Sequence, residues 1–421
     1  MSIFTISALL LVFAGIFGLF NYHVLKLPTT IGLVVISFAV SVAMIVADWL
    51  LPGPAIFETV REIVTGIPFQ EVVLDGLLSY LLFAGALRVN LADLAEQKWA
   101  IAALATLGVG LSTVLVGLGF HWVTGIPLMV ALVFGALISP TDPVAVMGIL
   151  KLVKVPRPLE TKIAGESLFN DGVGVVIFLI LTQMAFGSSP HDAPITTIDV
   201  LRLFVVEVLG GALLGGLCGY VTFLMIRSVD EFNLEVILTL ALVTGTYSLA
   251  QSLHLSGPIA VVIAGLFIGN HGVRRGMSEL TWSYVDKFWH LIDEILNAVL
   301  FLLIGFEVFA ISYEGPYLMA AAVAIPLVLV ARFIAIWVPI SALGLRRQFT
   351  RGSISVMTWG GLRGGISVAL ALSLPDSEHK ALLLTVTYAV VIFSIVIQGL
   401  TIRPVIRTLV PLEATDGKTA E

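Results

Sequence analysis

The sequence predicts an all-α protein that crosses a membrane many times, and three observations support this fold class. Of the 421 residues, 58% are hydrophobic and 12% are charged, whereas an average soluble domain is about 25% charged. The apolar residues fall into runs of about 20, the length of helix that crosses a bilayer. The basic residues are concentrated in alternate connections between these runs, as expected for a polytopic membrane protein.

Thirteen transmembrane spans are expected from the lengths of the apolar runs and from the Gly and Pro residues that interrupt them. The expected ranges are 3–22, 30–51, 70–88, 99–122, 127–151, 163–186, 200–227, 234–253, 256–272, 289–311, 316–343, 353–374 and 380–403.

The distribution of basic residues predicts the orientation of the chain. Of the 22 Lys and Arg, 17 follow odd-numbered spans, and only Arg61, Arg202 and Lys380 fall in the other connections. Because cytoplasmic loops are enriched in Lys and Arg, we expect the N-terminus outside and the C-terminus in the cytoplasm. The expected location is the cell (inner) membrane.

The fifth span contains a sequence that should interrupt its helix. Pro140 and Pro143 flank Thr141 and Asp142 in the string SPTDPVAV. Proline removes a backbone donor and disfavours helix at the preceding residue, so the span should unwind there. Asp142 would then lie about halfway across the membrane.

The sixth span carries four polar residues on one side. Glu166, Ser167, Asn170 and Asp171 lie within about 140° of each other on a helical wheel. Asp171 is about eight residues into the span, on the order of 12 Å deep. An ionisable residue at this depth typically marks the path of an ion or a proton.

The eleventh and twelfth spans each contain one arginine, Arg332 and Arg363. Glycine pairs on both sides of Arg363 weaken the helix, so a second break is expected in the twelfth span. The two broken spans are seven apart, as expected if spans one to six and eight to thirteen form inverted repeats. Such paired interruptions indicate a transport site near the midplane.

The string SPTDPVAV, with GESLFNDGVGVVIF and GGLRGG further along, resembles the monovalent cation:proton antiporter family, which includes bacterial sodium/proton antiporters and animal sodium/hydrogen exchangers. The resemblance covers the whole order of spans. It implies thirteen spans, a core part with crossed broken helices, and a second part that forms a homodimer. The implied boundaries are approximately 70–186 and 289–403 for the core part, 1–69 and 200–272 for the dimerisation part, and 404–421 for a short cytoplasmic tail.

The resemblance also implies a role for each polar residue of the first two motifs. Asp171 would bind the cation and the proton, with Asn170 as its neighbour. Asp142 and the backbone of Thr141 would flank the site from the broken helix, and Ser167 would be an oxygen ligand.

The remaining buried charges would shape the site. The resemblance implies that Glu166 pairs with an arginine, which its position in the eleventh span suggests is Arg332. Arg363 would hold the crossing of the broken helices on the other side. A purely structural ion pair remains an alternative for Glu166, and a simple helix cap remains an alternative for Asp142.

The chemistry of these residues agrees with exchange of a cation for a proton. Sodium and lithium are hard cations that bind oxygen ligands. A carboxylate in a partly desolvated cavity would hold a proton or a cation, so competition at Asp171 would couple the two fluxes. The neutral Asn170 favours one-for-one, electroneutral exchange, because related antiporters with two adjacent aspartates are electrogenic.

The expected function is therefore sodium/proton (or lithium/proton) antiport with a role in pH homeostasis, without enzymatic activity, a cofactor or a nucleic-acid partner. The partners expected are membrane lipid and a second copy of the chain. Potassium/proton exchange is the near alternative, and a cation channel is the distant one. An intramembrane aspartyl protease is disfavoured because neither Asp142 nor Asp171 lies in a GxGD motif.

Overall fold

The computed structural model describes residues 3–50, 69, 71–142, 146, 147, 150, 153, 155–187, 197–273, 276–310, 314–344 and 352–409. Within these ranges every named element is a helix, and the one isolated β-bridge joins Asp142 to Leu362. The prediction of an all-α fold is confirmed.

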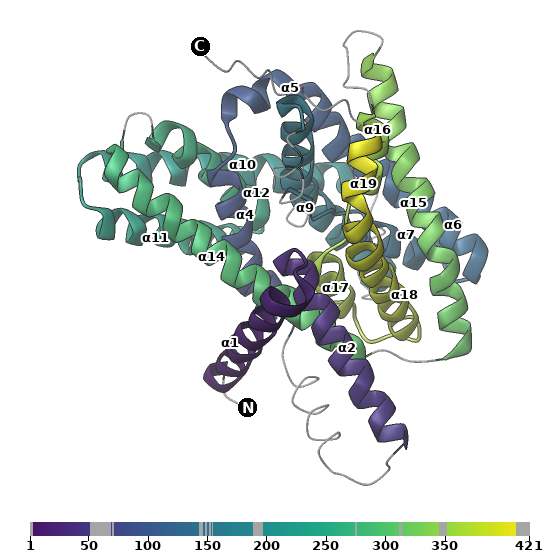
Figure 1. The fold of residues 1–421 in the computed structure, drawn as a ribbon. Helices are drawn as coiled ribbons and strands as arrows, with labels where there is room; N and C mark the ends of the chain where they lie inside the picture. The colour runs from purple at the N-terminus through teal and green to yellow at the C-terminus, as the bar shows by residue number, and fades with distance from the viewer. Residues whose placement is uncertain are drawn as a thin grey trace, which may run out of the picture.

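Figure 1 shows the helices coloured by their order along the chain, from purple at the N-terminus to yellow at the C-terminus. They are α1 (Ile3–Phe20), α2 (Thr29–Leu50), α4 (Leu78–Leu87), α5 (Leu91–Ala103), α6 (Val109–Thr124), α7 (Leu128–Leu137), α9 (Arg157–Phe186), α10 (Thr197–Arg227), α11 (Phe232–Ser252), α12 (Gly257–Phe267), α14 (Glu279–Phe306), α15 (Gly315–Gly344), α16 (Ser353–Trp359), α17 (Gly365–Leu372), α18 (Lys380–Phe393) and α19 (Gly399–Leu409).

Short turns of other helical types extend or join several of these helices. The π-helical turns are Asn21–Leu25, Glu71–Leu77, Leu104–Gly108, Ile268–Gly272 and Ser394–Gln398, and Glu307–Ala310 is a 3₁₀ turn.

Eight helices in the described part of the chain are long and apolar enough to cross a membrane. Three further apolar helices, at Val72–Leu87, Leu128–Leu137 and Gly257–Gly272, are shorter. The protein is thus a multi-pass membrane protein, while the count of thirteen spans and the inverted repeat remain predictions.

Two helices begin well before the apolar runs that predicted them. α14 starts ten residues before the expected span 289–311, where the Ser278 side chain accepts a hydrogen bond from the Thr281 backbone N–H. α5 starts at Leu91, where Asn90 caps it by accepting from the Ala92 N–H at 2.8 Å. Hydropathy marks only the apolar part of such a helix, whereas the capping residue fixes its first turn.

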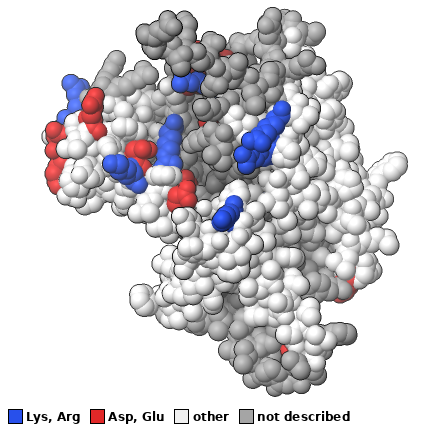
Figure 2. Space-filling model, viewed as in Figure 1, with Lys and Arg blue, Asp and Glu red and all other residues white. Residues whose placement is uncertain are grey.

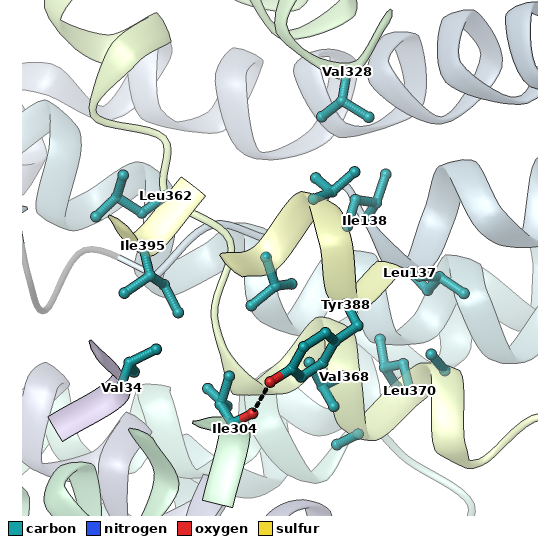
Figure 3. Packing of buried hydrophobic residues seen from close by; sticks show 14 of the residues in the cluster. Val34, Leu137, Ile138, Ile304, Val328, Leu362, Val368, Leu370, Tyr388 and Ile395 are labelled. Carbon is teal, nitrogen blue, oxygen red and sulfur yellow. Dashed lines mark hydrogen bonds between the residues drawn. The ribbon is translucent and has the colours of Figure 1, made fainter. Parts of the chain in front are cut away.

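The helices form two groups with α9 between them (Figure 1). α9 packs against α5 and α7 on one side and against α10 and α12 on the other. Trp289 is fully buried in the apolar cluster that contains α12, with its ring centroid 4.7 Å from that of Phe83. In the cluster that contains α7, the Tyr388 hydroxyl donates to the Ile304 carbonyl at 2.7 Å, among apolar side chains of several helices (Figure 3). α9 therefore lies where the two groups meet.

Charged side chains are unevenly distributed over the surface. On the face shown in Figure 2, the described Lys, Arg, Asp and Glu side chains gather mostly in the upper half, and most of the described surface in the lower half is uncharged. An uncharged surface of this kind suits contact with lipid, because charged side chains are costly in the hydrocarbon region.

Candidate functional site

Two interruptions of helical structure meet near the centre of the protein. α7 ends at Leu137, and residues 139–141 are not helical, so the fifth predicted span breaks where Pro140 and Pro143 indicated. The second interruption separates α16 from α17 at residues 360–364. The Asp142 N–H donates to the Leu362 carbonyl at 2.8 Å. Each interruption thus satisfies part of the backbone of the other, as irregular segments inside a membrane require.

Arg363 binds the two interruptions together. The side chain is 2% exposed, and its Nη1 donates to the carbonyls of Ser139 and Pro140. Its backbone N–H donates to Ser394 Oγ at 2.9 Å. The guanidinium lies just beyond the C-terminus of α7, where the helix dipole is negative. Arg363 therefore contacts both interruptions, and its role of holding the crossing remains a prediction.

Close packing explains two glycines of the GGLRGG motif. A Cβ added at Gly364 would lie 2.6 Å from Asp142 Oδ2, and one added at Gly361 would lie 2.5 Å from Arg332 Nε. Both distances are shorter than a real carbon contact. The glycines therefore let the second interruption approach both Asp142 and Arg332.

Glu166 and Arg332 form a buried ion pair between α9 and α15. Arg332 Nη1 donates to Glu166 Oε1 at 2.6 Å, and Nη2 donates to Oε2 at 2.8 Å. The Glu166 side chain is 1% exposed and the Arg332 side chain is 8% exposed. Glu166 therefore contacts Arg332, the arginine that its position in the sequence had suggested.

Asn170 connects this ion pair to the first interruption. Its side-chain N–H groups donate to Glu166 Oε1 at 3.0 Å and to Thr141 Oγ1 at 2.8 Å. The hydroxyls of Thr141 and Ser167 lie 3.2 Å apart. A single network thus runs from Arg332 through α9 to the break after α7.

A cavity of about 500 Å³ reaches Asp171, Asp142 and Ser167. Asp171 is 5% exposed, and its Oδ1 has no hydrogen-bond partner among the described residues. Asn170 and Thr141 are buried but do not belong to the lining of this cavity. Of the five predicted binding residues, three line the cavity, and Asn170 and Thr141 lie outside its lining.

Most of the charged residues that line the cavity are more exposed than Asp171. They include Arg88, Asp93, Arg157 and Glu160, which follow odd-numbered predicted spans. Arg88 forms ion pairs with Asp286 at 3.3 Å and with Asp293 at 3.5 Å. Both ion pairs are partly exposed, so a charged entrance leads to the buried Asp171.

Several polar residues of the cavity wall were not found from the sequence, and Ser367 is the one among them that lies directly after the second break. Ser367, the third residue of α17, lines the cavity and is 1% exposed. The available signal was its place directly after the glycine-flanked break, in the string GGIS. Sequence alone does not separate this serine from the other serines within apolar helices.

The comparisons with known proteins support the family that these motifs resemble. The profile of the family described as "Sodium/hydrogen exchanger, transmembrane" matches residues 8–408. The Na(+)/H(+) antiporter NhaP of Pseudomonas aeruginosa is 46% identical over 412 residues, covering 94% of this chain and 95% of that protein. The Na(+)/H(+) antiporter NhaH of Halobacillus dabanensis is 36% identical, covering 91% of this chain and 93% of that protein.

A solved structure shows the same fold at low sequence identity. The sodium proton antiporter MjNhaP1 of Methanocaldococcus jannaschii, solved at pH 8, matches with a TM-score of 0.73 and 19% identity, covering 96% of this chain and 97% of that one. The extent of the profile match and the identity to the bacterial relatives lead to one conclusion: the chain belongs to the transmembrane sodium/hydrogen exchanger family.

Proposed function

We propose that the protein is a secondary antiporter that exchanges sodium or lithium for protons through competition for Asp171. The observation that carries the proposal is a buried carboxylate in the lining of a cavity beside two crossing helix breaks, with one oxygen that has no partner among the described residues. Relatives that match over nearly their whole length are named Na(+)/H(+) antiporters, which supports the same activity for this chain.

In the proposed cycle, Asp171 binds either a proton or a cation that enters through the cavity. Asp142 and Ser167 supply further oxygens from the cavity wall, and the Thr141 carbonyl supplies another at the break. Unwound backbone and half-helix ends commonly bind cations in transporters of this architecture. Because one carboxylate carries one occupant at a time, release of one ion must precede binding of the other.

Movement between the two faces is proposed to follow the two-part organisation expected from the sequence. The core part, approximately 70–186 and 289–403, would rock against the dimerisation part, approximately 1–69 and 200–272, in a homodimer embedded in lipid. The packing of α4 on α12 and of α14 on α2 indicates that α4 and α14 lie along the proposed boundary. The proposed orientation places the entrance at Arg88 and Arg157 on the cytoplasmic side of the cell membrane.

The buried arginines are proposed to hold the site rather than to bind the cation. Arg332 neutralises Glu166, and Arg363 fastens the two interruptions through carbonyl groups. Neither arginine lines the cavity that contains Asp171. Their positive charges are therefore directed away from the path of the transported ion.

The function is tested by reconstituting the protein in liposomes that enclose a pH-sensitive dye and carry a preset proton gradient. Adding sodium or lithium should collapse the gradient. A response to potassium instead would identify potassium as the transported cation and would leave the proposed exchange mechanism unchanged. Sodium flux without proton movement would indicate a channel, and the absence of any cation-dependent signal would refute the proposal.

Stoichiometry gives a separate prediction at Asn170. We expect exchange by the parent protein to be independent of membrane potential, and Asn170→Asp to make it voltage-dependent because a second ionisable carboxyl then adjoins Asp171. The measurement is the exchange rate in liposomes clamped at several potentials with potassium and valinomycin.

Asn170→Ala is the control for this stoichiometry test. It removes the same two donated hydrogen bonds without adding a charge, so its residual exchange should remain voltage-independent. Unchanged electroneutrality in Asn170→Asp would show that this position does not set the stoichiometry.

A further inference from the structure

Ser367 is a buried polar residue on the wall of the cavity. Its side chain is 1% exposed, and its hydroxyl has no hydrogen-bond partner in the part of the chain that the structure describes. Leaving a buried hydroxyl without a partner is costly. Such a group therefore calls for a ligand or a water molecule.

Ser367 lies close to the second interruption. It is the third residue of α17, which begins at Gly365 directly after the second break. Because Cα–Cβ bonds in a helix tilt toward its N-terminus, the side chain leans back toward the break. Val368 and Leu370, on the same helix, lie in the apolar cluster around Tyr388 (Figure 3).

Ser367 lines the same cavity as Asp171, Asp142 and Ser167. The cavity thus contains two unpartnered oxygens in the described structure, Asp171 Oδ1 on α9 and Ser367 Oγ on α17. These oxygens come from two different helices, whereas Ser167 lies on the same helix as Asp171. A ligand on α17 would therefore approach an ion held at Asp171 from a different helix than Ser167 does.

We propose that Ser367 is a further oxygen ligand of the transported cation, supplied by the helix that follows the second break. This inference rests on the proposed antiport function and adds to its predicted ligands. The hydroxyl oxygen offers a lone pair to sodium or lithium when Asp171 is ionised. When Asp171 holds a proton instead, the same hydroxyl can hydrogen-bond to water in the cavity.

A ligand that contacts the cation and not the proton should affect the two substrates differently. Ser367→Ala is expected to raise the sodium concentration for half-maximal exchange about tenfold, the order of effect expected for losing a hydrogen-bond-strength contact to a charged group. The maximal rate at saturating sodium should change much less. The measurement is dye dequenching in proteoliposomes over a sodium titration at fixed pH.

Ser112→Ala is the matched control because it makes the same chemical change elsewhere. Ser112 is 3% exposed, and its hydroxyl is likewise unpartnered among the described residues, but Ser112 does not line the cavity. Its half-saturating sodium concentration should stay within about twofold of the parent's. Equal shifts in the two variants would overturn the proposal, because the effect would then come from loss of any buried hydroxyl.

A binding measurement separates this proposal from the antiport function. Sodium should raise the thermal unfolding temperature of detergent-purified parent and Ser112→Ala proteins, and Ser367→Ala should need a higher sodium concentration for the same rise. If the parent shows no cation-dependent exchange, the antiport function fails. If the parent exchanges normally and Ser367→Ala has the parental sodium dependence in both assays, only the role of Ser367 fails.

Discussion

Asp171→Asn is expected to reduce sodium- and lithium-dependent proton exchange to the background of empty liposomes, a loss of at least about 100-fold. Asparagine nearly matches aspartate in shape but can neither release a proton at physiological pH nor neutralise a bound cation. Since Asp171 Oδ1 has no partner among the described residues, the change breaks no hydrogen bond at that oxygen. The variant should therefore fold normally and lose only exchange, as measured by dye dequenching.

Asp93→Asn is the matched control for this loss. Asp93 is also a carboxylate in the lining of the cavity, but it lies in the first turn of α5 at the charged entrance. This control variant should keep most of the exchange activity, because it removes one charge from the cavity lining and leaves the Asp171 carboxylate intact. Full exchange by Asp171→Asn would contradict this prediction and would assign the essential carboxyl group to Asp142 or Glu166 instead.

Glu166→Gln is expected to cause the largest loss of stability among single substitutions at the site. It leaves the Arg332 guanidinium buried without its counter-charge, and breaking a buried ion pair from one side costs about 3–5 kcal/mol. Glutamine keeps an oxygen that can accept from Asn170, so the loss can be assigned to the missing charge. Thermal unfolding of the purified protein in detergent, followed by size-exclusion chromatography, measures the change.

The double variant Glu166→Gln/Arg332→Met tests the cause of this destabilisation. Methionine fills part of the arginine volume without a charge, so no buried cation remains unpaired. The double variant should regain most of the unfolding temperature lost in Glu166→Gln, as found when buried ion pairs are replaced by apolar side chains. If it is no more stable than the single variant, the shape of the pair rather than its charge holds α9 against α15.

The sequence was sufficient to predict features that depend on position along one segment. Pro140 and Pro143 located the first interruption because their effect on the backbone is local. Helical geometry placed Glu166, Ser167, Asn170 and Asp171 on one side of a helix, and all four are buried in α9, while the depth of Asp171 in the membrane remains a prediction. The choice of Arg332 over Arg363 as the partner of Glu166 came from the family resemblance and span order, and the described contacts agree with it.

Features that depend on packing between helices far apart in the chain could not be predicted from the sequence in the same way. Ser112 and Ser367 are both serines within apolar helices, yet only Ser367 faces the cavity. The sequence also gave Asn170 no preferred partners, whereas the structure shows it joining Glu166 to Thr141. Helix periodicity defines which residues share a face but not what the face meets.

The mutual support of the two interruptions has a consequence for biosynthesis. The Ser139 carbonyl accepts from Arg363, which lies 224 residues further along the chain. At about 5–20 residues per second of translation, Arg363 emerges on the order of 10–45 s after Ser139. Until then, the first interruption lacks a partner that its backbone has in the finished protein. The nascent chain must therefore keep this segment hydrated or shielded by the insertion machinery, and the ion site forms only near the end of synthesis.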